Sequence, residues 1–245
     1  MTEGGPDAAG SGRTAAVVPA AGRGERLGTG VAKALRLLDG SPLLVHAART
    51  LASSSYVDLV VVAAPPADVL EVHTLLAGEH AGADLVVVAG GSSRQESVGL
   101  ALAVLPDGVD QVLVHDAARP LVPVEVVDRV VAALRDGAAA VVPGIAVADT
   151  VKRVQRAQVV ETLDRSMLCA VQTPQGFRRA ILEAAHRAAS ATGALLATDD
   201  AALVEAAGTP VVVVPGHDEA FKVTRPLDLL LAEAVLAQRK ATGVR

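Results

Sequence analysis

The sequence predicts an α/β fold built on a doubly wound, mostly parallel sheet. Short apolar runs alternate with longer stretches of helical period, and a continuous apolar run is typical of a strand buried on both faces of a parallel sheet. One later segment departs from this order and has the pattern of an extended β-hairpin. In such a sheet, ligands bind beyond the carboxyl ends of the strands.

The predicted strands are short and rich in valine. They are Ala15–Pro19, Leu59–Ala63, Leu85–Ala89, Gln111–His115, Ala139–Pro143 and Val211–Val214. Between and after them, apolar residues at helical spacing predict helices. One stripe comprises Val126, Val127, Val130, Val131 and Leu134. A second stripe follows Pro226, a favourable first-turn residue, and comprises Leu227, Leu230, Leu231, Ala234 and Val235.

The hairpin pattern runs from Ile145 to Leu163, with valines at nearly alternate positions and charges between them. We expect a β-arm at about residues 145–165 within a single domain of residues 13–245. A hairpin that cannot bury its apolar face alone usually finds a partner chain. Residues 1–12 contain Gly, Ser, Pro and acidic residues without an apolar core, and we expect a disordered lead-in.

Composition excludes several classes of function. The 245 residues carry a net charge of −5 with a pI near 5.7, which argues against a nucleic-acid or anionic-membrane binder but not against a small phosphorylated substrate. Cys169 is the single cysteine, which excludes an internal disulfide and favours a reducing compartment. No apolar run approaches the roughly 18 residues of a membrane span. We therefore expect a cytoplasmic protein.

A glycine-rich loop with basic side chains follows the first strand. Gly22 and Gly24 allow backbone N–H groups to converge on an anion, and Arg26 and Lys33 would add full positive charges. The small side chains of Ala20–Ala21 would let a base or ribose approach the backbone. The plainer interpretation is a glycine-rich turn with surface basic residues. A P-loop is excluded, and the glycine spacing misses the dinucleotide fingerprint by one residue.

Two more segments carry candidate binding groups. Residues 90–98 read G-G-S-S-R-Q-E-S-V, a pattern of ordinary helix capping in which Arg94 and Ser97 could also contact a base or a phosphate. At the end of the fourth strand, Asp116 is a candidate carboxylate for Mg²⁺, and Arg119 could bind the phosphate of a second substrate. We expect His115 to pack and orient neighbours without taking part in the chemistry.

Later segments are less informative taken singly. We expect Gln172–Gln175 to precede a helix that contains Phe177, and Thr198–Asp200 to open another helix. Lys222 is expected on a strand after a glycine turn, where a lone lysine usually faces solvent.

Together these motifs resemble the bacterial 2-C-methyl-D-erythritol 4-phosphate cytidylyltransferases of the non-mevalonate isoprenoid pathway. The matching pieces are P-A-A-G-x-G-x-R with a following Lys, G-G-x-x-R-x-x-S-V, V-L-V-H-D-A-A-R-P, D-T-V-K, D-R-S, T-P-Q-x-F, T-D-D and G-x-x-x-x-x-K-V-T. They span Pro19 to Thr224 in the family's order. Two positions depart from the pattern: Ala32 replaces the usual Pro before Lys33, and Ala220 and Phe221 replace the usual Asn near Lys222.

The resemblance implies a Rossmann-like fold of the nucleotidyltransferase type and transfer of CMP from CTP to methylerythritol phosphate, with Mg²⁺ as cofactor. It implies catalytic roles at the CTP phosphates and the acceptor for Lys33, Lys222 and Arg26. It implies a CTP site of Ala20, Ala21, Gly22, Gly24, Gly91, Ser92, Arg94, Ser97 and Ala117, with Asp116 holding the metal. Acceptor contacts would come from Arg119 and Thr198 and, across a dimer through the arm, from Thr150 and Arg165.

Three alternatives stay open from the sequence. The same chemistry could act on another polyol phosphate such as ribitol 5-phosphate, since that sister group shares the loop and the lysines. A catalytically silent nucleotide-binding protein is a second alternative, although such proteins should lose Lys33, Asp116 or Lys222 first. A dinucleotide-dependent oxidoreductase is disfavoured, because the glycines are misplaced and no acidic residue ends the second strand.

Overall fold

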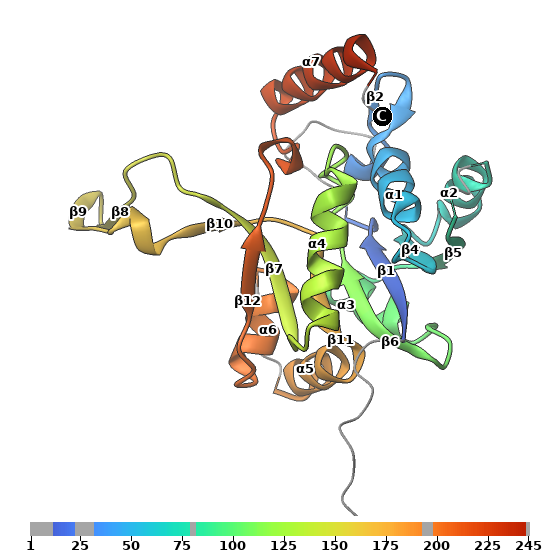
Figure 1. The fold of residues 1–245 in the computed structure, drawn as a ribbon, viewed down its shortest axis with the longest axis horizontal. Helices are drawn as coiled ribbons and strands as arrows, with labels where there is room; N and C mark the ends of the chain where they lie inside the picture. The colour runs from blue at the N-terminus through green and yellow to red at the C-terminus, as the bar shows by residue number, and fades with distance from the viewer. Residues whose placement is uncertain (1–11, 23–31, 79–81, 193–197, 244–245) are drawn as a thin grey trace, which may run out of the picture.

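A mostly parallel sheet forms the centre of the computed structural model, which describes residues 12–22, 32–78, 82–192 and 198–243 (Figure 1). Its strand order is β10-β7-β11-β6-β1-β4-β5, and β12 pairs with β7 outside this path. Its strands are β1 (Arg13–Pro19), β4 (Leu59–Ala64), β5 (Asp84–Ala89), β6 (Val109–Val114), β7 (Ala140–Ala146), β10 (Cys169–Val171), β11 (Gln175–Arg178) and β12 (Val212–Pro215). Strand β11 runs antiparallel to both β6 and β7, and β10 runs antiparallel to β7.

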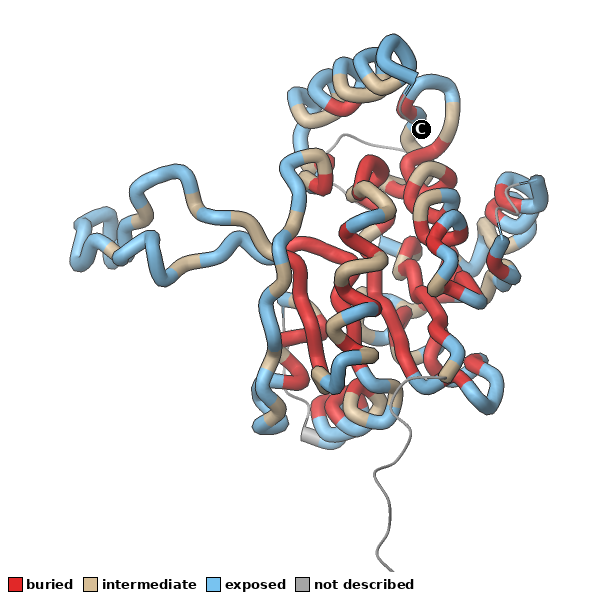
Figure 2. The backbone as a smooth tube through the Cα atoms, viewed as in Figure 1, coloured by how far each residue is buried: buried red, intermediate tan, exposed pale blue. Residues whose placement is uncertain are grey.

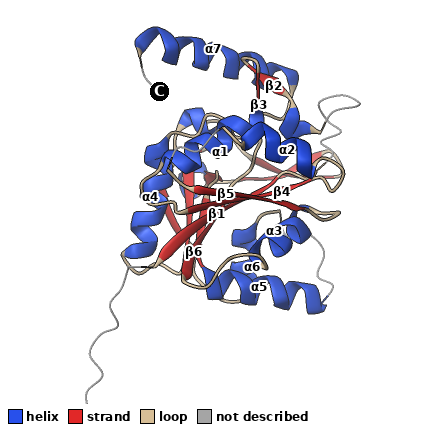
Figure 3. Cartoon of the chain, turned by 90° about the vertical axis from the view of Figure 1, so that its right-hand side faces the viewer, coloured by secondary structure: helices blue, strands red, loops and turns tan. Residues whose placement is uncertain are grey.

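Helices cover both faces of this sheet, as Figure 3 shows. One layer comprises α1 (Leu43–Ser53), α2 (Val69–Leu76) and α4 (Val124–Arg135). The opposite layer comprises α3 (Arg94–Leu102), α5 (Arg179–Thr192) and α6 (Asp200–Ala206). Helix α7 (Pro226–Thr242) lies apart from both layers, near the small β2 (Leu37–Leu38) and β3 (Ser41–Pro42) ladder.

Strand β1 shows why the sequence specifies two layers. Its side chains alternate in direction, so Ala16 and Val18 pack with the first helix layer, whereas Ala15 and Val17 pack with the second. All four are fully buried. A strand that is apolar at every position therefore fits only between two covered faces, which confirms the predicted doubly wound sheet.

All six predicted strands are present, but the structure adds β11, and Phe177 lies on this strand instead of on a helix. The prediction for Phe177 was wrong because the strand is only four residues long and the α5 helix begins directly after it, at Arg179. Close packing against α4 explains the glycine at position 176, since a Cβ there would lie 2.5 Å from Val130 Cγ1.

The two predicted apolar stripes behave differently. In α4, all five stripe residues are buried, as expected. In α7, the helix begins at Pro226 as predicted, but Leu227, Leu230 and Leu231 are 73%, 62% and 52% exposed. Of the predicted stripe, Val235 packs against the rest of the chain, on a face that it shares with Leu229 and Ala232. Within the described ranges, no helix has both the length and the apolar character that a bilayer span requires.

Within the predicted arm, β8 (Lys152–Gln155) and β9 (Gln158–Thr162) form a two-stranded ladder, whereas Ile145 and Ala146, where the arm was expected to begin, belong to β7. It projects away from the sheet and is exposed throughout both strands (Figure 2). Val154, Val159 and Val160 are each more than half exposed. The arm thus presents apolar side chains that its own chain leaves uncovered.

A buried histidine joins the end of β6 to the segment before β11. His115 is fully buried, and its Nε2 lies 3.2 Å from the carbonyl oxygen of Arg119. Because a carbonyl only accepts, Nε2 carries the hydrogen, and Nδ1 accepts from the Thr173 hydroxyl at 3.0 Å. The same hydroxyl accepts from the backbone N–H of Asp116 at 3.1 Å. His115 therefore packs and orients the strand end, as the sequence predicted.

This arrangement predicts a pH-dependent stability. Burial lowers the pKa of His115 from 6.5 to about 4, so the unfolded chain takes up a proton at a higher pH than the folded chain. The contribution to stability is complete above pH 6.5 and falls by up to about 3 kcal/mol as the pH drops toward 4. Denaturant unfolding of H115Q at several pH values should show a flatter decline over this interval. H73Q, at an exposed histidine of α2, is the matched control; parallel curves for H115Q and the native chain would contradict the prediction.

Candidate active site

A cleft of about 280 Å³ lies beyond the carboxyl ends of β1 and β6, where a doubly wound sheet presents ligands. Nine of the predicted site residues line it: Ala20, Ala21, Gly22, Lys33, Arg94, Ser97, Asp116, Ala117 and Lys222. They come from five separate segments of the chain. Gly24 and Arg26 lie outside the described residues.

The loop after β1 and the loop before α3 approach each other closely in the cleft. A Cβ on Gly90 would lie 2.6 Å from the Cβ of Ala21, so only glycine permits this approach. Ser97 then closes the second loop, since its Oγ accepts from the N–H of Gly91 at 3.0 Å and donates to the carbonyl of Ser93 at 2.8 Å.

Ser92 is not in the cleft lining, because its N–H and hydroxyl both donate to the carboxylate of Glu96. This contact and the Ser93 cap of α3 give residues 90–97 a preformed turn. The predicted contacts of Gly91 and Ser92 with cytosine stay predictions.

Asp116 is the electrostatic centre of the cleft. Its Oδ1 accepts from Arg94 Nε at 3.2 Å, and its Oδ2 lies 2.7 Å from Lys222 Nζ. Burial opposes ionisation of this carboxyl, but the charges of Arg94 and Lys222 outweigh burial and hold the pKa of Asp116 well below its ordinary range. Asp116 is therefore a carboxylate at neutral pH, and it pairs with two cations in the cleft that the loop after β1 also lines.

Lys222 lies on an extended segment and not on a strand, so the predicted strand there is wrong. The short 3-10 helix η4 (Asp218–Ala220) precedes it, and Val223 N–H donates to the carbonyl of Ala118 at 2.8 Å. Arg119 secures the same segment through a 2.7 Å bond from Nη1 to the carbonyl of Ala220. These anchors direct Lys222, whose side chain is 42% exposed, into the cleft.

Four residues predicted to bind the acceptor lie outside the cleft lining. Arg119 donates to the backbone carbonyls of Ala220 and Val171. Thr150 and Arg165 belong to the arm, where Arg165 Nη1 donates to the carbonyl of Ala148 at 2.6 Å. Thr198 is exposed directly before α6. Their contacts with an acceptor stay predictions.

The sequence analysis missed the carboxylate that supports Arg94. Asp200 is 1% exposed, and its Oδ2 accepts from Arg94 Nη1 at 2.6 Å. Its neighbour Asp199 caps α6 and accepts from Gln175 Nε2 at 2.7 Å. The signal was the pair of consecutive acids in T-D-D, since one caps a helix and the next points inward.

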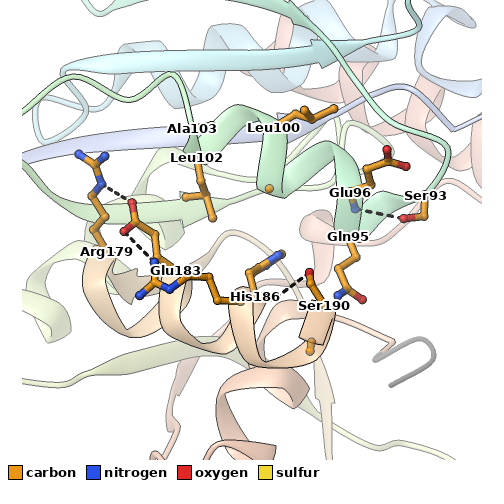
Figure 4. Close-up of a pocket in the computed structure, with 13 residues that line it drawn as sticks. Ser93, Gln95, Glu96, Leu100, Leu102, Ala103, Arg179, Glu183, His186 and Ser190 are labelled. Atoms are coloured by element: carbon orange, nitrogen blue, oxygen red, sulfur yellow. Dashed lines mark hydrogen bonds and ion pairs between the residues drawn. The ribbon is translucent and has the colours of Figure 1, made fainter. Parts of the chain in front are cut away.

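A larger hollow of about 950 Å³ lies between α3 and α5, and Figure 4 shows its lining. It contains none of the predicted site residues. Its arginines Arg179 and Arg187 both pair with Glu183. The smaller cleft is therefore favoured as the functional site, because the loop after β1, Asp116 and the two lysines converge there.

Comparison with known proteins agrees with this geometry. The chain matches the family profile described as 2-C-methyl-D-erythritol 4-phosphate cytidylyltransferase over residues 14–238. The enzyme of that name from Streptomyces avermitilis is 60% identical over 238 residues, which cover 93% of each chain.

Solved structures of the same kind align over nearly the whole chain. The 2-C-methyl-D-erythritol 4-phosphate cytidylyltransferase of Thermus thermophilus has a TM-score of 0.72 at 37% identity, covering 91% of this chain and 98% of that one. The 4-diphosphocytidyl-2C-methyl-D-erythritol synthase of Anaerococcus prevotii has a TM-score of 0.80 at 26% identity, covering 92% and 99%. Profile, sequence and fold coincide, and the chain belongs to the 2-C-methyl-D-erythritol 4-phosphate cytidylyltransferase family.

Proposed function

We propose that this cytidylyltransferase transfers CMP from CTP to 2-C-methyl-D-erythritol 4-phosphate in the cleft around Asp116, releasing pyrophosphate. The observation that carries the proposal is the convergence of Lys33 and Lys222, far apart in the chain, on one cleft beside the glycine loop. The family supports the activity, and the convergence of these side chains on one cleft supports the roles proposed for them.

The reaction is an in-line displacement at the α-phosphorus of CTP. An oxygen of the acceptor's phosphate forms the new bond to phosphorus, and the bond to the bridging oxygen breaks, so that pyrophosphate leaves with the electron pair. Because the attacking oxygen is already ionised, no general base is needed. The obstacle is repulsion between two anions, and catalysis of this kind depends on positioning and charge stabilisation.

Each cation of the cleft has a proposed role in reducing the repulsion between the two anions. Lys33 and, from the loop outside the described residues, Arg26 would neutralise the triphosphate. Lys222, held 2.7 Å from Asp116, would stabilise charge on the five-coordinate phosphorus and draw the acceptor's phosphate toward it. Arg94 and Ser97 would position the nucleotide side of the cleft.

The cleft could hold a magnesium ion through a single carboxylate. Within the described residues, no group of three or more His, Cys, Asp and Glu side chains could form a protein cage for a metal. Asp116 offers one ionised carboxylate, and Mg²⁺ is commonly bound by one or two carboxylates together with phosphate oxygens and water. Asp116 would hold the ion, which supplies charge neutralisation at the triphosphate when bound.

The arm has a proposed role in a homodimer. Its valines are exposed in the single chain, and the arm that carries Thr150 and Arg165 projects away from the central sheet (Figure 1). We infer that the arm packs on a second copy and brings these two side chains to that copy's acceptor site. Residues 13–245 would then act as one domain with the arm as its dimerisation element, in the cytoplasm.

The choice of acceptor is tested by direct assay. The purified protein is incubated with CTP, Mg²⁺ and either methylerythritol phosphate or ribitol 5-phosphate, and pyrophosphate release and the CDP-linked product are followed. We expect efficient turnover with methylerythritol phosphate and little with the other polyol. Preference for ribitol 5-phosphate would reassign the substrate, whereas CTP binding without product from any acceptor would indicate a silent nucleotide-binding protein.

The lysine roles are tested by substitution. K33A and K222A should each lower the rate of pyrophosphate release by a factor on the order of 10²–10³, because an oriented charge at the reacting phosphate is lost. K240A on α7 is the matched control, since Lys240 pairs with Asp39 and lies outside the cleft lining. Near-normal turnover by folded K33A or K222A would exclude that lysine from the role.

The shared site predicts complementation between two inactive variants. R165A and K222A should each be inactive as homodimers, but a heterodimer carries one site with both native residues. Random pairing of co-expressed variants should therefore restore about a quarter of native activity, as expected for a two-fold dimer. Activity no higher than that of the single variants would show that the arm does not complete a partner's site.

A further inference from the structure

A linear chain of charged contacts runs from helix α5 to the cleft. His186 Nε2 lies 2.8 Å from Asp200 Oδ1, and Arg94 Nη1 donates to Asp200 Oδ2 at 2.6 Å. Arg94 Nε then donates to Asp116 Oδ1, while Asp116 Oδ2 faces Lys222 Nζ. Each carboxylate uses one oxygen toward each neighbour, so the order of the five side chains is fixed.

His186 is the end of this chain that lies farthest from the reaction. It sits on α5 beside the hollow between α3 and α5 and does not line the cleft (Figure 4). Its side chain is 8% exposed. Because a carboxylate only accepts, Nε2 must carry the hydrogen shared with Asp200. Any influence of His186 on the reaction has to pass through Asp200.

Asp200 needs both of its partners. An ionised carboxylate that is 1% exposed is costly unless its oxygens are paired and hydrogen-bonded. Burial opposes ionisation, but the hydrogen bond from His186 and the charge of Arg94 lower the pKa of Asp200. With His186 removed, Oδ1 loses this donor, and the carboxylate is free to rotate toward Arg94 with both oxygens.

The orientation of Arg94 depends on this pairing. Its planar guanidinium is held between Asp200 and Asp116 through two different nitrogens, so a rotation of Asp200 also turns the Nε–H away from Asp116. The carboxylate of Asp116 would then no longer be held in one orientation by Arg94 while it pairs with Lys222. The ammonium group would lose its placement, although its charge would remain.

We propose that His186 is a positioning residue for the transfer reaction, acting through Asp200, Arg94 and Asp116 on the placement of Lys222. This inference rests on the proposed roles of Asp116 and Lys222 in the cleft. It assigns a function in catalysis to a buried side chain of the α5 helix that touches neither substrate nor the reacting atoms.

The test compares three replacements of one side chain. H186L removes the donor and should lower kcat for CMP transfer about tenfold, with KM for CTP changed less than about twofold, because ground-state binding of CTP is retained. H186Q places an amide N–H near the position of Nε2 and should keep kcat within about twofold of native. H186N is too short to reach Asp200 and should resemble H186L.

Two further variants separate positioning from packing. In S190A, one turn further along α5, a hydroxyl that donates to the His186 carbonyl is lost while the Asp200 contact remains, so kcat should be native. In a D200N background, H186L should lower kcat no further, since His186 is proposed to act on Lys222 only through Asp200. Thermal unfolding of each variant identifies any that do not fold. If H186L does not fold, the comparison of kcat between H186Q and H186N tests the proposal instead.

The proposal is overturned if folded H186L or H186N keeps native kcat, if H186Q is as slow as H186N, or if the losses in H186L and D200N multiply. Failure of the underlying function is distinguishable from these outcomes. In that case the native protein would give no product, or K222A would turn over normally, whatever the behaviour of the His186 variants.

Discussion

The pairing of Asp116 with two cations is the interaction on which the cleft depends. Arg94 comes from the start of α3 and Lys222 from the segment before α7, and both converge on one carboxylate at the end of β6. A carboxylate at this depth stays ionised because the two cations compensate for burial, and the ionised carboxylate in turn gives both cations a common partner. The sheet supplies the fixed point, since Asp116 follows directly from a central strand flanked by β1 and β11.

This dependence explains the packing around the site. Burial lowers the pKa of His115 to about 4, so this side chain is neutral at pH 7 and adds no positive charge beside Asp116 and Arg119. Arg119 uses its guanidinium to tie down the Lys222 segment, and Val223 adds a backbone bond to Ala118. The groups surrounding Asp116 therefore serve geometry more than chemistry, as expected where a reaction is accelerated by preorganised charge.

The sequence predicted the sheet well because continuous valine runs have one physical interpretation, a strand covered on both faces. Local patterns at strand ends and helix starts indicated most of the nine cleft residues, whereas Lys222 and Ala117 were expected there only through the family resemblance. Prediction from the sequence failed where a segment's place depends on distant partners. Strand β11 is short and follows from its neighbours β6 and β7, and Lys222 is positioned by Arg119 from about one hundred positions away in the chain. The support of Arg94 by Asp200 is a contact across 106 positions, so the two acids of T-D-D indicated an inward carboxylate but not which cation it meets.

The order of these segments has a consequence for how the enzyme is made. A chain emerging from the ribosome presents the β1 loop, α3 and Asp116 long before Lys222, and domains fold progressively as synthesis proceeds at roughly 5–20 residues per second. Until the Lys222 segment emerges and forms its bonds with Arg119 and Ala118, the nascent protein has Asp116 and Arg94 without the second lysine of the cleft. The ammonium group that pairs with Asp116 is thus added late in synthesis, after the other described segments of the cleft have emerged.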